Sequence, residues 1–158
     1  MTLVLTSLAL LAIGAATSLL LTRVPRLALN LAMLCAFVAA VLAVIAASDV
    51  LLYSLSPSPY EAAWPLSLGT ARLSLDGLSA WFLMTIGVLA ACVAIYSVPY
   101  MSSAVGREPV PVFCALFCTL LASLILLVCS ADAVLFLISW ESMTLTAFFL
   151  VAFRHDRP

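Results

Sequence analysis

The sequence contains no lysine and very little charge of either sign. Only 8% of its 158 residues are charged, 66% are hydrophobic, and the mean hydropathy is +1.31. A soluble domain normally carries charge on about a quarter of its residues, so a water-soluble fold of this composition would expose too much apolar surface. Six basic residues also form no patch for a nucleic acid. The scarcity of charge predicts a protein surrounded mainly by lipid.

The sequence also lacks the usual signs of a catalytic or metal site. It shows no nucleophile next to a base, no phosphate-binding glycine loop and no metal cage. Cys114 and Cys118 share a helix face, which leaves a metal or redox pair as an alternative to simple packing. All five cysteines lie in apolar runs without CxxC or Cys/His spacing, which favours packing: Cys35, Cys92, Cys114, Cys118 and Cys129. We expect no cofactor, no metal and no bond chemistry in this chain.

Five apolar runs are each long enough to cross a bilayer as a helix. About 20 residues at 1.5 Å per residue span the hydrocarbon core, and only helices satisfy the backbone there without a closed barrel. The sequence therefore predicts an all-α membrane protein, one transmembrane domain over residues 1–158, with a long external loop over 48–76. The predicted spans are 2–22, 27–47, 77–100, 110–129 and 133–153.

The arginines predict the orientation of these helices. With the N-terminus outside, only Arg72 is external, and the other five lie on the cytoplasmic side: Arg23, Arg26, Arg107, Arg154 and Arg157. The first run is read as a retained helix, because its basic residues follow the apolar stretch, whereas a signal peptide has them before it. We expect a multi-pass protein of the inner (plasma) membrane with a cytoplasmic C-terminus.

The external loop has recognisable turn and strand patterns. Residues 56–59 read Ser-Pro-Ser-Pro, which is typical of an extended turn segment. Residues 65–75 alternate apolar with small or polar side chains around Gly69, which predicts a short β-hairpin. Asp76 stands where a helix N-cap would lie. Aromatic residues mark the expected membrane interfaces: Trp64, Trp81, Tyr96 and Tyr100.

Glu141 is the main candidate for a functional residue. It lies about two turns into the fifth run, where a carboxylate costs a few kcal/mol unless it is protonated, paired or hydrated. Intramembrane acids usually face a pathway, so we favour a role in proton movement. The alternative is that Glu141 only ties neighbouring helices together. Four nearby hydroxyls are candidates to hydrogen-bond to it or to hold water: Ser139, Ser142, Thr144 and Thr146.

Other polar residues have more ordinary interpretations. Asp132 is expected to cap the fifth helix, and Asn30 is expected to hydrogen-bond between helices. His155 lies in the sequence Arg154-His155-Asp156-Arg157, a solvated end of the fifth helix. Because imidazole titrates near neutral pH, His155 is a secondary candidate for proton uptake; simple solvation is the more common role.

Two stretches resemble the antiporter-like membrane subunits found in respiratory complex I, membrane-bound hydrogenase and formate hydrogenlyase complexes, and Mrp-type cation/proton antiporters. One is Leu-Asp-Gly-Leu-Ser-Ala-Trp-Phe over 75–82, running on to Ile-Tyr-Ser-Val-Pro-Tyr-Met over 95–101. The other is Asp-Ala-Val-Leu-Phe-Leu-Ile-Ser-Trp-Glu-Ser-Met over 132–143, followed by Phe-Phe-Leu-Val over 148–151. The resemblance implies that Glu141 matches the fifth-helix glutamate of the proton pathway, which modulates a lysine on the seventh helix.

The sequence departs from that family in having no lysine and in ending at Pro158. We therefore expect the N-terminal third of such a protein, in a redox-driven complex resembling NADH–quinone oxidoreductase or a hydrogenase. Its partners would be other membrane subunits, including a chain that supplies the lysine-bearing helices. The transported ion, proton or sodium, and the electron donor and acceptor stay open. The alternatives are a structural or assembly subunit without transport, and a small independent transporter.

Overall fold

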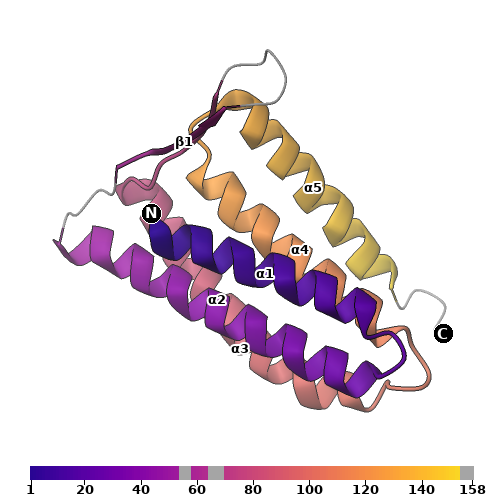
Figure 1. Cartoon of the computed structure of the whole chain (residues 1–158). Helices are drawn as coiled ribbons and strands as arrows, with labels where there is room; N and C mark the ends of the chain where they lie inside the picture. The colour runs from indigo at the N-terminus through magenta and orange to yellow at the C-terminus, as the bar shows by residue number, and fades with distance from the viewer. Residues whose placement is uncertain (54–57, 64–69, 154–158) are drawn as a thin grey trace.

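The computed structural model describes residues 1–53, 58–63 and 70–153. Over these ranges it contains five helices and one antiparallel β-hairpin between the second and third helices (Figure 1). Each helix is long and apolar enough to cross a membrane, so the predicted fold class is confirmed. The elements are α1 (Thr2–Leu20), α2 (Pro25–Tyr53), β1 (Tyr60–Ala63), β2 (Thr70–Leu73), α3 (Gly77–Ser102), α4 (Val110–Cys129) and α5 (Ala133–Ala152).

The second helix differs most from its predicted span of 27–47. It begins at Pro25, which suits the first turn of a helix because its missing N–H has no intrahelical partner there. It continues to Tyr53 because residues 48–53 contain neither glycine nor proline, so the predicted loop over 48–76 begins later than expected. The other ends differ by no more than two residues, and α4 has the predicted bounds.

Small side chains set the packing of the first three helices. α2 lies between α1 and α3 (Figure 1), and the residues that it buries include alanines at 28, 32, 36, 39, 40, 43, 46 and 47. Such residues let helix backbones approach closely. On α3, a Cβ added to Gly87 would lie 2.7 Å from Val44 Cγ2 and 3.0 Å from the Ala40 carbonyl oxygen. The backbones of α2 and α3 are therefore in close contact at this point.

The hairpin is fastened to the ends of α4 and α5. Ser74 N–H donates to the Cys129 carbonyl at 2.9 Å, and Ala131 N–H donates to the Arg72 carbonyl at 2.8 Å. Leu73, the last residue of β2, and Leu75, two residues later, are buried. These bonds extend the edge of β2 with the short segment that joins the two helices.

The hairpin lies earlier in the chain than the sequence predicted. β2 falls within the expected residues 65–75, but its partner β1 precedes them, and Gly69 and Trp64 lie outside the described residues. Glu61 is opposite Arg72 in the register, and Arg72 Nε lies 2.9 Å from Glu61 Oε1. This exposed pair of opposite charges favours the observed pairing of the two strands. The alternating pattern of residues 65–75 did not contain this signal.

Candidate functional site

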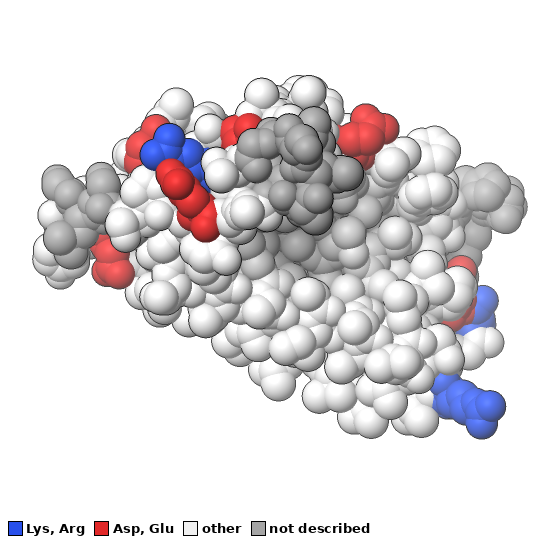
Figure 2. Space-filling view, turned by 45° about the horizontal axis from the view of Figure 1, so that its top comes forward, with Lys and Arg blue, Asp and Glu red and all other residues white. Residues whose placement is uncertain are grey.

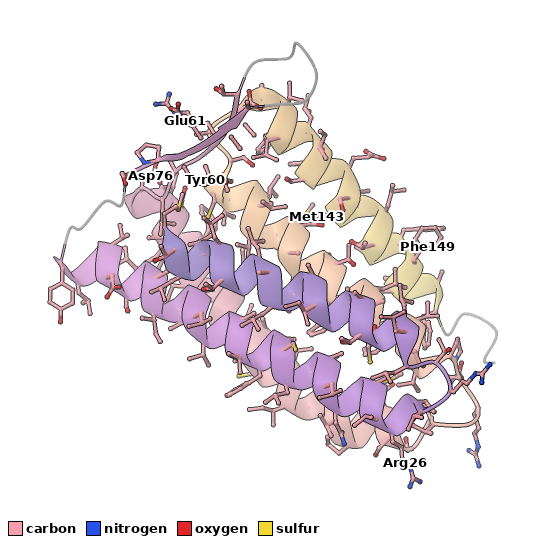
Figure 3. The ribbon with its side chains drawn as sticks, viewed as in Figure 1. Arg26, Tyr60, Glu61, Asp76, Met143 and Phe149 are labelled. Atoms are coloured by element: carbon pink, nitrogen blue, oxygen red, sulfur yellow. The ribbon has the colours of Figure 1, made fainter. Side chains whose placement is uncertain are left out.

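Charged side chains gather at the two ends of the helical bundle. Figure 2 shows acidic residues along the hairpin end and arginines at the opposite end, and Figure 3 places Glu61 and Asp76 far from Arg26. Among the described residues, the hairpin end carries Asp49, Glu61, Arg72, Asp76 and Asp132, and the opposite end carries Arg23, Arg26, Arg107 and Glu108. Glu141 is the one charged residue of the described chain that lies between these ends.

The Glu141 side chain points away from the other helices. It follows the first residue of α5 by eight positions, about 12 Å along the helix axis, and its side chain is exposed. It shares this face with Ile138, Leu145 and Phe148, all exposed. No side chain in the described ranges forms a hydrogen bond or ion pair with Glu141. At mid-span, such a carboxylate requires a proton, water or a partner.

The neighbouring hydroxyls are divided between the two sides of α5. Ser139 and Thr146 are buried on the side that packs against α4, and Ser142 is half-buried there. Thr146 donates to the Ser142 carbonyl at 2.7 Å. Thr144 is exposed and donates to the Trp140 carbonyl at 3.0 Å. Their role in hydrating Glu141 stays a prediction, and His155 lies outside the described residues.

A hydroxyl pair joins α4 to α5 within the membrane span. Ser123 Oγ lies 2.9 Å from Ser142 Oγ and 2.8 Å from the Thr119 carbonyl oxygen. Each hydroxyl has a single proton, so when Ser123 donates to the Thr119 carbonyl, Ser142 donates to Ser123. This contact could not be predicted from the sequence, because the pairing of Ser123 depends on how the two helices pack. Ser139 Oγ, also on this side, is buried without a hydrogen-bond partner among the described atoms.

Two carboxylates are helix caps, as predicted. Asp76 Oδ1 accepts from Ser79 N–H at 2.7 Å at the start of α3, and Asp132 Oδ2 accepts from Leu135 N–H at 3.0 Å at the start of α5. The hydrogen bond from Ser79 N–H lowers the pKa of the Asp76 carboxyl below its ordinary value. Local helix geometry therefore explains the position of these two residues.

The remaining candidates show no site chemistry in the described chain. Cys114 and Cys118 are buried free thiols, and Cys118 Sγ lies 3.8 Å from the Ala32 carbonyl oxygen. Within the described ranges, no group of three or more His, Cys, Asp or Glu side chains is placed to hold a metal ion. Asn30 is exposed and has no hydrogen bond to a described residue, in contrast to the bond between helices that the sequence predicted. It lines a groove between α2 and α3.

The helix that carries Glu141 is also the least buried of the five. Figure 1 shows α5 at the margin of the bundle, beside α4 and beneath the hairpin. Its outward face carries large exposed apolar residues together with Glu141: Phe136, Leu137, Ile138, Trp140, Leu145, Phe148 and Val151. The other four helices bury a larger share of their residues within this chain.

Part of this chain is similar in sequence to known membrane proteins. Residues 67–108 match the family model described as NADH-Ubiquinone oxidoreductase (complex I), chain 5 N-terminus. The chain is 31% identical over 97 residues to a probable K(+)/H(+) antiporter component of Rhizobium meliloti, and 30% identical over 95 residues to hydrogenase-4 component B of Escherichia coli. These alignments cover 61% and 59% of this chain. The comparisons support the antiporter-like family.

The fold of this chain has a solved counterpart. A chain in the structure of the membrane-bound sulfane sulfur reductase, an archaeal respiratory membrane complex, matches it with a TM-score of 0.79 and 21% identity. That match covers 99% of the present chain but 31% of the solved one. The alignments likewise cover only 9% of the Rhizobium protein, and 14% of both the Escherichia protein and an uncharacterized protein of Mycobacterium tuberculosis. The chain therefore spans only a small part of the length of these relatives.

Proposed function

We propose that this chain is a membrane subunit of a redox-driven ion-translocating complex of the complex I or membrane-bound hydrogenase type, and that Glu141 is part of its proton path. The observation that carries the proposal is a carboxylate at mid-span on α5 that faces outward and has no partner among the described residues. An acid at that depth is costly, and the family resemblance gives it a role. Relatives named as a hydrogenase component and as part of an antiporter support the assignment of the complex.

A proton path through Glu141 needs a second group that exchanges a proton with it or tunes its protonation. The sequence contains no lysine, and the outward face of α5 is otherwise apolar apart from Thr144. The partner group would therefore come from a membrane segment outside these five helices that packs against this face. His155 would serve as a group that takes up protons from the water beyond α5.

We also propose that the hairpin end lies outside an inner (plasma) membrane and the arginine end lies in the cytoplasm. The support is the positive-inside rule, because three of the four described arginines lie opposite the hairpin. With this orientation the C-terminal end of α5 lies on the cytoplasmic side, where protons would enter. Chemical labelling of single cysteines placed at Ser58 and Arg107 tests the orientation, since only the former should react from outside.

The decisive experiment is Glu141→Gln in the native complex. The amide has nearly the same size and shape as the carboxyl group but does not titrate, so we expect coupled proton uptake into inverted vesicles to fall to background. Assembly, followed by native electrophoresis, should be retained. Glu61→Gln is the matched control, because it removes an exposed carboxylate from the hairpin and should leave uptake unchanged. Proton uptake by Glu141→Gln at the wild-type rate would exclude the proposed path.

A structural or assembly role is the second candidate, and the exposed apolar face of α5 favours it. In that case Glu141→Gln would be silent, while Leu137→Ala combined with Phe148→Ala would prevent the complex from assembling. If that double variant assembles normally, this role is contradicted. Measuring the uptake of sodium, in place of protons, by the same vesicles distinguishes the two possible ions.

A further inference from the structure

A groove of about 230 Å³ opens on the surface of the bundle between α2 and α3. Its walls include Met33, Leu34 and Phe37 from α2, and Ile95 and Val98 from α3. Leu34 is 58% exposed and Ile95 is 62% exposed, so the groove is open along one side. Asn30 is the only polar residue among those that line it. Residues 30 to 37 extend about 10 Å along α2.

A free cationic group lies directly beyond the polar end of this groove. Arg26 precedes Asn30 by four residues and therefore lies on the same helix face, one turn closer to the N-terminus of α2. Figure 3 shows Arg26 at that end of the bundle, with its side chain pointing away from the helices. Among the described residues Arg26 forms no ion pair. The positive end of the α2 dipole lies at the same place.

The chemistry along this face changes in the order found in a phospholipid. It begins with a guanidinium and a helix N-terminus, which both attract a phosphate. It continues with one amide at the level of Asn30 and ends with a purely apolar trough. The described charges at this end are three arginines and one glutamate, so an anionic headgroup is electrically complementary to it.

We propose that the α2–α3 groove binds one anionic phospholipid, with its phosphate at Arg26, its ester region at Asn30 and an acyl chain between Leu34 and Ile95. This site is separate from α5 and does not depend on the function proposed for Glu141. The groove is formed by α2 and α3, whereas α5 packs mainly against α4. The two surfaces can therefore be altered independently.

The test measures lipid retained by the full chain, extracted in its native assembly with mild detergent and exchanged into nanodiscs containing both phosphatidylglycerol and phosphatidylcholine. After return to mild detergent, native mass spectrometry counts the lipids that remain bound. We expect phosphatidylglycerol to be retained in preference to phosphatidylcholine. Arg26→Gln should lower this preference about fivefold, the effect of one arginine near a phosphate. Arg72→Gln, at the hairpin end, is the matched control and should not change it.

A second pair of variants tests the trough. Leu34→Trp and Ile95→Trp place a bulky ring in the groove and should reduce retention of the lipid. Leu89→Trp changes an equally exposed α3 residue (61%) that does not line the groove, and it should retain the lipid. Retention without headgroup preference, or a preference that Arg26→Gln leaves intact, overturns the proposal. So does efficient crosslinking of Leu34→Cys to another protein chain, because a protein would then occupy the groove.

Discussion

The contact between Gly87 and α2 gives a direct test of the packing. Gly87→Ala would place a methyl carbon 2.7 Å from Val44 Cγ2 and 3.0 Å from the Ala40 carbonyl oxygen. Two carbons normally approach to about 3.5–4.0 Å, so the first contact is short by about 1 Å. Because one of the opposing atoms belongs to the backbone, side-chain rotation alone does not relieve the overlap. The helices must shift apart.

The expected cost follows from these distances. Overpacking a filled interface costs about 1–3 kcal/mol, and the better helix propensity of alanine returns at most about 1 kcal/mol. We expect Gly87→Ala to lower the free energy of unfolding by about 1–2 kcal/mol, which corresponds to a fall of several degrees in the unfolding midpoint. Adding Val44→Ala to this variant should recover only part of the loss, because the contact with the Ala40 carbonyl oxygen remains.

The buried thiols provide the assay. Cys114, Cys118 and Cys129 are buried, so they react with a thiol-specific fluorophore mainly after unfolding. Heating the detergent-solubilised protein with this reagent, in a Cys92→Ser background that removes the exposed thiol, gives the midpoint. Gly77→Ala is the control, because a Cβ there meets nothing within 4 Å. If Gly87→Ala has the same unfolding midpoint as Gly77→Ala and the parent protein, the close α2–α3 contact is refuted.

Two further predictions concern single hydrogen bonds. Asp76→Ala should lower the free energy of unfolding by about 1 kcal/mol through loss of the α3 cap, while Asp76→Asn should retain most of it. The folded pKa of Asp76 is lowered from 3.8, so its contribution is complete above that pH and disappears as the pH falls below it. Between pH 5 and pH 3, the thermal midpoint of the parent protein should show a fall that Asp76→Asn does not show. For Ser123 and Ser142, a double-mutant cycle to alanine should give a coupling of about 0.6 kcal/mol, and zero coupling would mean that the two hydroxyls do not interact.

The sequence was sufficient to predict the helices because their signals are local. Each span combines length with continuous hydrophobicity, and Asp76 and Asp132 stand directly before the helices that they cap. The predicted end of α2 at residue 47 was too early, because polar residues that follow an apolar run do not by themselves stop a long helix. The partner of β2 was not predicted, because the alternation of apolar and polar residues lies around Gly69. Glu61, which pairs with Arg72, precedes that pattern.

The direction of Glu141 could not be predicted from the sequence. Apolar residues occur on every side of α5, so periodicity does not show which side packs against a neighbour. The hydroxyls of Ser139, Ser142 and Thr146 suggested a polar surrounding for Glu141, but residues three or four positions apart share a face and those two positions apart do not. Ser139 and Glu141 are two apart, and the structure places them on different sides of the helix.

The hydrogen bonds between the hairpin and the α4–α5 segment also constrain the order in which the chain assembles. Residues 72 and 131 are neighbours in space, and α3 and α4 lie between them in the chain. The Arg72 carbonyl therefore has no bond from Ala131 until both intervening helices have been synthesised and have crossed the bilayer. Until then the edge of β2 is an unpaired strand edge at the membrane surface, the kind of edge that pairs with other chains. Closing this long loop protects that edge as α5 begins to insert, so the protection of the hairpin edge depends on the insertion of α4.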